Sequence, residues 1–446
     1  MLRFAVRYII VGVALFTLLI SVTRIEGQST LAAEHDGVYA LRWMDLLYRL
    51  VQNEGVQAPA ASRIYAYAGV ALYEGVVNGM PSNYSLAGQL IDMPEMPLPE
   101  ENMEYDWPAV ANGTLAKVIA GLFDDPDEET LAAIADLRQE IFDERAEEVG
   151  EEVVRRSNDY GSKIGDELLE WIATDGYAET LEMDAEYELP TGSDLSLYTL
   201  TLEGSRPIGP YWGTLRPFAL FFTEVCHVPL NMLFSEDRDS AFYAQAHEVF
   251  EIGNNLTREQ REIARFWFDP PNTTGLPAGH WVSIENQMVE QRNLNLEQAA
   301  GMYSLVGMAL ADSFISAWSL KYEVMLLRPE TYIHQYIRRS WQPYIQTPPF
   351  PEYPSGHSVV SGAAAEVLTS LFGIVAFTDR THIIYDHEPL VREFTSFEAA
   401  AYEAAISRLY GGIHYRAAIE NGLRQGRCVG QQVLENIRLG PIPQNE

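Results

Sequence analysis

The segment TPPFPEYPSGHSVVSGAAAEVLTSLFG, residues 347–373, holds the strongest structural signal in the sequence. Its four prolines keep the first eight residues extended, and the small and apolar residues that follow predict a tightly packed helix. Ser355 and the amide of Gly356 supply hydrogen-bond donors at the start of this helix, and a glycine there lets the backbone come close to a ligand. The free amides of the first turn therefore predict an anion-binding site.

A second segment, KYEVMLLRP at residues 321–329, carries two cations that lie seven residues apart. Seven residues span two helical turns, so we expect Lys321 and Arg328 to leave the same face of one helix. Either residue alone would usually be a solvated surface charge. Together they can clamp the oxygens of an anion from one side.

A third segment, SRLYGGIH at residues 407–414, adds Arg408 and His414. Six residues are close to two turns, so both side chains face the same pocket if the helix continues through the two glycines between them. With His357, the three segments supply three long cations and two histidines, a set of groups that suits one tetrahedral oxyanion. The whole chain has a net charge of −33, so this basic cluster contrasts with its surroundings.

The three segments, in this order and spacing, resemble the vanadium-dependent haloperoxidases and the wider type 2 phosphatidic acid phosphatase superfamily. The shared pattern is Lys, six residues, Arg-Pro; then PSGH; then Ser-Arg, five residues, His. Residues 321–430 carry the firm part of the resemblance. The N-terminal half shows no residue-level match of comparable strength.

The resemblance implies a bound vanadate, with His414 as its covalent metal ligand and His357 as the acid and base beside it. The oxyanion would be held by the cofactor-binding residues Lys321, Arg328, Ser355, Gly356, Arg408 and His414. Lys321 would also be catalytic, because its hydrogen bond withdraws electrons from bound hydrogen peroxide. The implied reaction oxidises a halide to hypohalous acid, which halogenates a small organic acceptor. Phosphate has nearly the same shape as vanadate, so it would compete for the site.

Trp318 and Phe350 resemble the aromatic pair that lines the halide side of chloroperoxidase-type sites. Aromatic residues beside an apolar helix are also ordinary core residues, so a core role stays open for both. The stretch TPPFPEYPSGH around Phe350 is the most specific indication of a peroxidase in the chain.

Two alternative functions use the same residues. With phosphate in the site, His414 would attack phosphorus and the chain would be an acid phosphatase. The chain could also be a catalytically weakened, exported oxyanion-binding relative, because Ala418 stands where the family usually has an aspartate that orients the ligand histidine. Glu420 or a backbone carbonyl would then have to orient His414.

Helical periodicity covers most of the chain, and no segment alternates clearly enough to predict a sheet. We therefore predict an all-α fold of helical bundles, with two four-helix-bundle-like halves and the oxyanion site at the end of the C-terminal bundle. The halves are residues 28–220 and 221–446, after an N-terminal segment 1–27. The expected helical segments include residues 39–55, 59–79, 111–125, 125–176, 237–254, 256–269 and 295–328.

At the N-terminus, Arg3 and Arg7 precede a 14-residue apolar run at 9–22. This run is short for a membrane span and typical of a signal peptide, so we expect export by secretion or to a periplasm, with an uncleaved anchor as the alternative. Cys226 and Cys428 either pair in an oxidising compartment or stay as two structural thiols. The acidic charge makes nucleic acid and anionic lipid poor partners, and a homo-oligomer stays open.

The remaining histidines carry weaker signals. His280, in PAGHWVSIENQ, is interpreted as structural, with a place at the pocket entrance as the lesser alternative. In THIIYDHEP, His382 and His387 lack the spacing of a metal site, so we interpret them, with Asp386 and Glu388, as surface residues.

Overall fold

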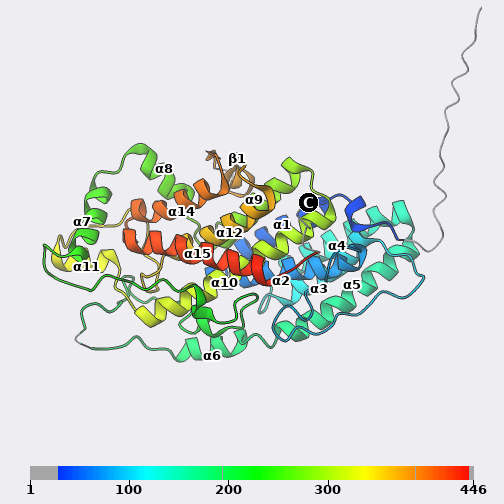
Figure 1. The fold of residues 1–446 in the computed structure, drawn as a ribbon, viewed down its shortest axis with the longest axis horizontal. Helices are drawn as coiled ribbons and strands as arrows, with labels where there is room; N and C mark the ends of the chain where they lie inside the picture. Colours follow the sequence, from blue (N-terminus) through cyan, green and yellow to red (C-terminus); the bar gives the residue numbers. More distant parts are fainter. Residues whose placement is uncertain (1–28, 193, 387, 441–446) are drawn as a thin grey trace, which may run out of the picture.

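The computed structural model describes residues 29–192, 194–386 and 388–440, and nearly all of their regular structure is helical (Figure 1), which confirms the all-α prediction. The expected signal segment 1–27 lies outside the described residues. The α-helices are α1 (Val38–Glu54), α2 (Ala58–Val76), α3 (Trp107–Gly121), α4 (Glu128–Val149), α5 (Glu151–Ile172), α6 (Tyr177–Glu186), α7 (Ala241–Asn254), α8 (Arg258–Phe266), α9 (Leu276–Arg292), α10 (Leu296–Val324), α11 (Pro329–Tyr336), α12 (Gly356–Phe372), α13 (Thr381–Tyr385), α14 (Phe397–Gly411) and α15 (Arg416–Asn436). The other elements are the 3-10 helices η1 (Ala32–Glu34), η2 (Val77–Gly79), η3 (Trp212–Thr214) and η4 (Thr223–Cys226), and the strands β1 (Phe377–Asp379) and β2 (Arg392–Phe394).

Helix α10 forms the centre of the protein. It packs against α2 on one side and α12 on the other; α2 leads through α3 to α5, and α12 packs on α14 and α15 (Figure 1). Within the described residues, α10 is long and apolar enough to cross a membrane, but its apolar stretch is almost wholly buried inside the protein. It is therefore a core helix. One continuous hydrophobic cluster runs from α1 to α15, and the division at residue 220 stays a prediction.

Close contact between the central helices depends on glycine. A Cβ at Gly426 on α15 would lie 2.0 Å from the carbonyl oxygen of Val359 on α12. At Gly69 on α2, a Cβ would lie 2.4 Å from the carbonyl oxygen of Tyr303 on α10. These distances leave no room for a side chain, so the paired backbones touch directly. The contact between α12 and α15 places the N-termini of both helices at the same end of the bundle.

The structure differs from the sequence prediction in one expected helix and in regions where no helix is expected. The segment expected to be helical at residues 125–176 breaks at Gly150, whose φ of 92° ends α4 before α5 begins. The Gly-, Pro- and Tyr-rich region at residues 176–217, which has little periodicity in the sequence, contains α6 and η3. Helix α9 escaped prediction because it is buried on nearly all faces, so its polar residues conceal the helical period. In addition, β1 and β2 form a short antiparallel ribbon.

The two cysteines form a disulfide between η4 and α15, Cys226–Cys428, which decides between the alternatives left open by the sequence. The loop before η4 is also attached to α10. The buried carboxylate of Asp312 accepts the backbone N–H groups of Phe218 and Ala219 at 2.7 and 2.8 Å. One loop is therefore fixed to two helices of the C-terminal part.

We expect Gly426→Ala to lower the free energy of unfolding by about 1–3 kcal/mol, the usual cost of overpacking a core, because α12 and α15 must separate to admit the methyl group. Chemical denaturation of the purified protein measures the loss. Gly192→Ala is the control, since a Cβ there meets no atom within 4 Å. Equal stability of the Gly426 variant and the native protein would contradict the packing described for these helices.

Candidate active site

The PSGH motif lies where the sequence predicts it, at the start of α12. Ser355 precedes the helix, and its hydroxyl oxygen accepts the backbone N–H and the hydroxyl of Ser358 at 3.4 and 2.9 Å. The N–H of Ser355 donates to the carbonyl of Ala418 in α15 at 3.2 Å. The first turns of α12 and α15 are thus tied together at the base of the site.

The expectation that Lys321 and Arg328 share one helical face is wrong. Helix α10 ends at Val324 because Met325 adopts a left-handed conformation with φ 51°, and Arg328 precedes α11 in extended backbone. The two side chains still converge, because both reach the proline-rich segment before α12, residues 347–354.

Lys321 and Arg328 bind the backbone of that segment. The Lys321 ammonium donates to the carbonyls of Pro351 and Glu352 at 2.8 and 3.1 Å, and also to that of Pro354. The Nε of Arg328 donates to the carbonyl of Phe350 at 2.9 Å. Backbone carbonyl oxygens therefore fix the positions of both cations.

The helix carrying Arg408 does not continue to His414, so the second helical expectation is also wrong. Helix α14 ends at Gly411, and Gly412 adopts φ 81°, a conformation that glycine reaches without strain. His414 lies in the turn before α15. Arg408 reaches the site from the last turn of α14, where its guanidinium donates to the carbonyl of Trp267 at 2.5 Å.

The hydrogen bonds of His414 define its tautomer. Its Nδ1 lies 2.9 Å from a carboxylate oxygen of Glu352, and its Nε2 lies 3.1 Å from a guanidinium nitrogen of Arg328. A guanidinium can only donate, so Nε2 carries the lone pair and Nδ1 carries the proton. Burial, with the nearby cations Arg328, Lys321 and Arg408, holds the pKa of His414 well below its usual value. The imidazole is neutral and presents a lone pair at Nε2.

Glu352 is the residue that sequence reasoning missed. Its carboxylate accepts from His414 Nδ1 and from the backbone N–H of Tyr415, both at 2.9 Å. Ala418 is fully buried, and Glu420 is exposed, where it lies 3.8 Å from Arg416. Neither Glu420 nor a carbonyl orients the imidazole. The one available signal was an acidic residue inside the proline-rich stretch, and no local spacing connects it to a histidine 62 positions later.

We call Lys321, Arg328 and Arg408 the cation cage. All three are buried, and burial lowers the pKa of Lys321 well below its usual value and that of each arginine to about 10. Two carboxylates act on this group through their charge, Glu352 on Lys321 and Arg328, and Asp269 on Arg408, and burial raises the pKa of Glu352 to about 7. One guanidinium nitrogen of Arg328, Nη2, is buried without a hydrogen-bond partner. Three buried cations against two carboxylates make an environment that favours an added anion.

His357 faces a different carboxylate. Its Nε2 lies 3.6 Å from Asp269, in the loop between α8 and α9. Burial and the charge of Arg408 lower the pKa of His357 to about 4, so the ring is neutral. His280 lies behind Asp269 and is fully buried, in agreement with a structural position and not with the pocket entrance.

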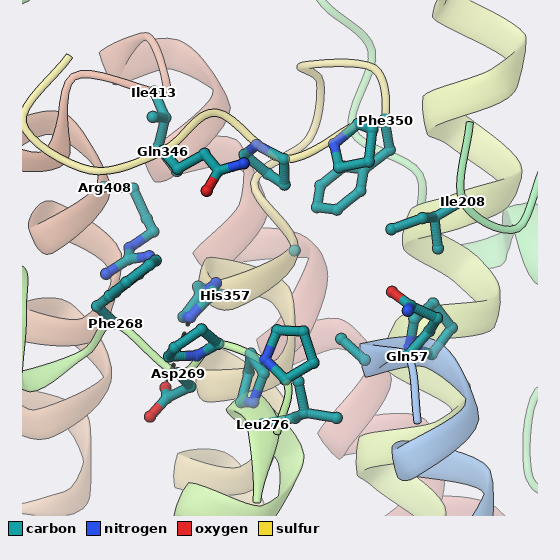
Figure 2. A pocket seen from close by; sticks show the side chains of 18 of the residues that line it. Gln57, Ile208, Phe268, Asp269, Leu276, Gln346, Phe350, His357, Arg408 and Ile413 are labelled. Carbon is teal, nitrogen blue, oxygen red and sulfur yellow. Dashed lines mark ion pairs between the residues drawn. The ribbon is translucent and has the colours of Figure 1, made fainter. Parts of the chain in front are cut away.

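Asp269, His357, Arg408 and His414 border a cavity of about 430 Å³. Figure 2 shows His357 and Arg408 on one wall, facing Phe350 and Ile208 on the other. The rings of Trp318 and Phe350 lie 5.0 Å apart, and the indole N–H donates to the carbonyl of Ile208 at 3.1 Å. The lining also includes Gly356, His414 and Trp318 together with six prolines, Pro59, Pro270, Pro271, Pro277, Pro348 and Pro349.

The interpretation of His382 as a surface residue is wrong. Its side chain is buried, with Nδ1 2.6 Å from Asp386 and Nε2 2.6 Å from the carbonyl of Phe266. A five-residue helix, α13, turns the ring inward, which the sequence pattern did not indicate. Glu388 lies near the surface beside Arg265, and His387 lies outside the described residues.

Residues 301–439 match a protein family described as the VCPO second helical-bundle domain. A bacterial vanadium-dependent iodoperoxidase of known structure is 34% identical, with a TM-score of 0.85, and the match covers 92% of this chain and 98% of that one. The holo and apo forms of a bacterial vanadium-dependent chloroperoxidase share the fold at 14% identity and a TM-score of 0.64, over 86% of this chain and 93% of theirs. Comparison with curated proteins finds no match.

We expect Glu352→Gln to weaken orthovanadate binding by about 10 to 100-fold, the usual effect of removing the partner that orients a metal-bound histidine. The amide oxygen of Gln can still accept both N–H groups, but the side chain is neutral, so it lacks the negative charge that makes the His414 imidazole a stronger ligand. Equilibrium dialysis of the purified protein measures the affinity. Glu420→Gln is the matched control, and a loss confined to that variant would show that Glu420 orients His414.

Proposed function

This chain belongs to the vanadium-dependent haloperoxidase family, and on that basis we propose that it oxidises iodide with hydrogen peroxide at the cation cage. The family assignment carries the vanadate cofactor and the oxidation of halide by peroxide. The preference for iodide is supported by the relative that is 34% identical, which is an iodoperoxidase. The observation that carries the assignment of residues is the neutral His414, whose Nε2 lone pair lies among three buried cations.

The residues present fit a vanadate ion. His414 would be its ligand through Nε2, and the cation cage would neutralise its oxygens. The unpartnered Nη2 of Arg328 supplies one donor, and Ser355 with the Gly356 amide supplies others at the start of α12. When bound, vanadate acts as a Lewis acid that makes peroxide electrophilic toward a halide.

His357 is suited to move the protons of this reaction. Hydrogen peroxide gives up a proton when it reacts as an anion, and the oxygen that leaves must be protonated to form water, so a group beside the site must accept and then return a proton. The one further proton that the overall reaction consumes comes from solvent. His357 is neutral and lines the cavity, so it can accept one. The ammonium of Lys321, which three backbone carbonyls hold in place, would act on the substrate through its charge.

The aromatic wall supports the choice of halide and of acceptor. Phe350 and Trp318 form an apolar surface close to the cation cage, with the ammonium of Lys321 5.1 Å and 5.6 Å from their ring centres. Iodide is large and weakly hydrated, so it loses little on contact with such a surface. We assign the proline-lined part of the cavity to a small apolar organic acceptor, because its lining offers few polar groups.

Export of the chain is part of the proposal. The apolar run at residues 9–22 and the disulfide Cys226–Cys428 support a secreted or periplasmic location, because disulfides persist in oxidising compartments. The alternative of an acid phosphatase is not favoured, since the solved relatives are haloperoxidases.

Protein incubated with orthovanadate should convert iodide to triiodide in the presence of hydrogen peroxide, followed by its absorbance. His414→Ala should abolish this activity and tight vanadate binding, because it removes the covalent ligand. His247→Ala, which removes a half-exposed histidine of α7, should retain both. Retained tight vanadate binding in the His414 variant would rule out the assignment. Bromide or chloride oxidised faster than iodide would contradict the halide preference alone.

Phosphate should delay reconstitution by vanadate, because the two tetrahedral anions need the same donors. A dissociation constant for phosphate of about 1 mM corresponds to about −4 kcal/mol, so millimolar phosphate should slow the onset of iodide oxidation. Sulfate, which is tetrahedral but carries no proton at neutral pH, serves as the comparison anion. An onset that is unchanged by phosphate would show that the cation cage is not the binding site.

A further inference from the structure

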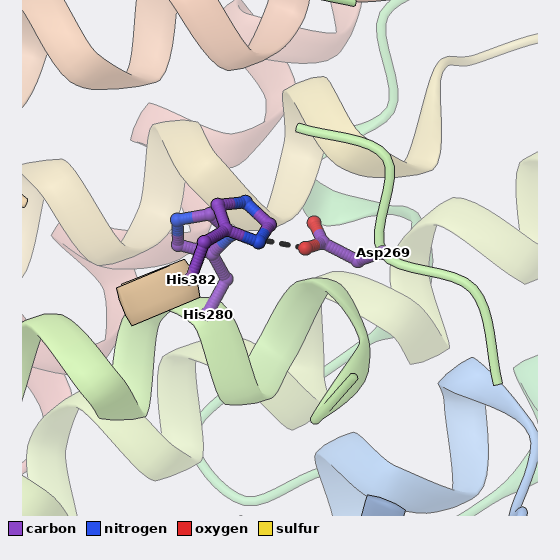
Figure 3. Close-up of side chains that lie close together, drawn as sticks. All are labelled: Asp269, His280 and His382. Atoms are coloured by element: carbon purple, nitrogen blue, oxygen red, sulfur yellow. Dashed lines mark hydrogen bonds and ion pairs between the residues drawn. The ribbon is translucent and has the colours of Figure 1, made fainter. Parts of the chain in front are cut away.

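Three buried side chains and His357, whose side chain is 20% exposed, form a row behind the cavity. His280 lies between two carboxylates, with Nδ1 3.0 Å from Asp269 and Nε2 3.0 Å from Asp379 (Figure 3 draws the contact with Asp269). Asp269 in turn lies 3.6 Å from Nε2 of His357. The row crosses the loop before α9, α9 itself, β1 and the first turn of α12. It links His357 to Asp269, which also lines the cavity. Beyond Asp269 it continues to His280 and Asp379, which do not line the cavity.

The partners of His280 fix its protonation. Both ring nitrogens face carboxylates, which can only accept when ionised, so both nitrogens must carry hydrogen. Asp379 is kept ionised by the N–H and hydroxyl of Thr381, at 2.9 and 2.6 Å. Burial alone would lower the pKa of His280, but Asp269 and Asp379 outweigh it and raise the pKa to about 10. His280 is therefore a buried imidazolium at neutral pH.

The other end of the row is incomplete, and this observation points to a function. The second oxygen of Asp269 and the Nε2 of His357 are both buried without a hydrogen-bond partner. They face each other at 3.6 Å, so a small movement of the His357 ring joins them. An Nε2–H directed at Asp269 leaves Nδ1 as the nitrogen of His357 that can reach the cavity.

We infer that His280 is a positioning residue for the peroxidase reaction, a charged bridge that holds Asp269 facing His357 and so fixes the tautomer of His357. This inference rests on the proposed role of His357. The O–H bond of entering hydrogen peroxide breaks, its proton goes to Nδ1 of His357, and the Nε2–H stays on the ring and donates to Asp269. The same proton is returned to the oxygen that leaves, and a second proton, taken up from solvent, completes the water; this second proton is the one that the overall reaction consumes.

The charges that face His357 set the direction of the effect. They are Arg408 from α14 and His280 from α9, which lower its pKa, and Asp269 from the preceding loop, which raises it. Removing the charge of His280 should therefore raise the pKa of His357. The neutral ring is the form that accepts a proton, so the acidic limb of the pH–rate profile should move to higher pH.

A metal ion is the competing interpretation of this cluster. Ligand atoms of Asp269, His280 and His382 lie within 4.8 Å of one another. Every ring nitrogen of the two histidines nevertheless already lies within hydrogen-bonding distance of an oxygen. A row of hydrogen bonds accounts for these contacts without a metal, and the two interpretations differ in what an elemental analysis would find.

The protonation is tested on the native, vanadate-free protein, so the result does not depend on any activity. Neutron diffraction at neutral pD should find deuterium on both nitrogens of His280. In ¹⁵N NMR, Asp379→Asn should make His280 titrate at lower pH, because one of its two carboxylates is gone. Deuterium on only one nitrogen, or a divalent metal bound in stoichiometric amount, would overturn the inference.

The kinetic test compares two buried histidines. His280→Gln should move the acidic limb of kcat for iodide oxidation up by about one pH unit, the scale of a nearby charge on a pKa. His382→Gln is the matched control, since His382 is also buried but hydrogen bonds neither Asp269 nor Asp379. Iodide oxidation by His280→Gln with an unchanged profile would refute the positioning role while leaving the proposed function intact. If His280→Gln does not fold, the NMR titration of Asp379→Asn decides alone.

Discussion

The site depends on one residue of the proline-rich segment, Glu352, because it binds both the segment that carries Lys321 and the segment that carries His414. Its carboxylate accepts hydrogen bonds from Nδ1 of His414 and from the backbone N–H of Tyr415, in the turn between α14 and α15. Its carbonyl accepts the ammonium of Lys321 at the end of α10, and its own N–H donates to Leu326 at 3.0 Å. Three segments distant in sequence are thus fixed relative to one another by the backbone and side chain of a single position.

This arrangement explains why three cations are tolerated in the interior. Isolated buried charges cost several kcal/mol each, and here part of that cost is offset by the carbonyls of the proline-rich segment. Prolines suit this task for two reasons. Their fixed φ holds the backbone in place, and because they have no N–H they prevent regular sheet pairing, so the carbonyls of the segment can accept hydrogen bonds from the cations. The remaining imbalance is what an oxyanion would remove.

Local chemistry was predictable from the sequence, and contacts across the fold were not. The start of α12 at PSGH and the helical class follow from short-range patterns, and the structure confirms both. Spacing failed where a single residue turned the chain: Met325 separates Lys321 from Arg328, and Gly412 separates Arg408 from His414. Met325 gives no warning, since a methionine with positive φ is unusual. Glu352 and His280 function through partners at least 11 residues away, which no local pattern reveals.

The cavity has walls from both parts of the chain, and this has a consequence for how the protein can diversify. The groups that would hold the anion come from residues 321–414, whereas Gln57 and Pro59 at the start of α2 and Ile208 in the long loop close the opposite side. Substitutions there alter what enters the cavity and leave the cation cage untouched. Selection for a new acceptor can therefore act on one stretch of the gene while the chemistry stays constant in another, so related chains are free to share a reaction and differ in what they modify.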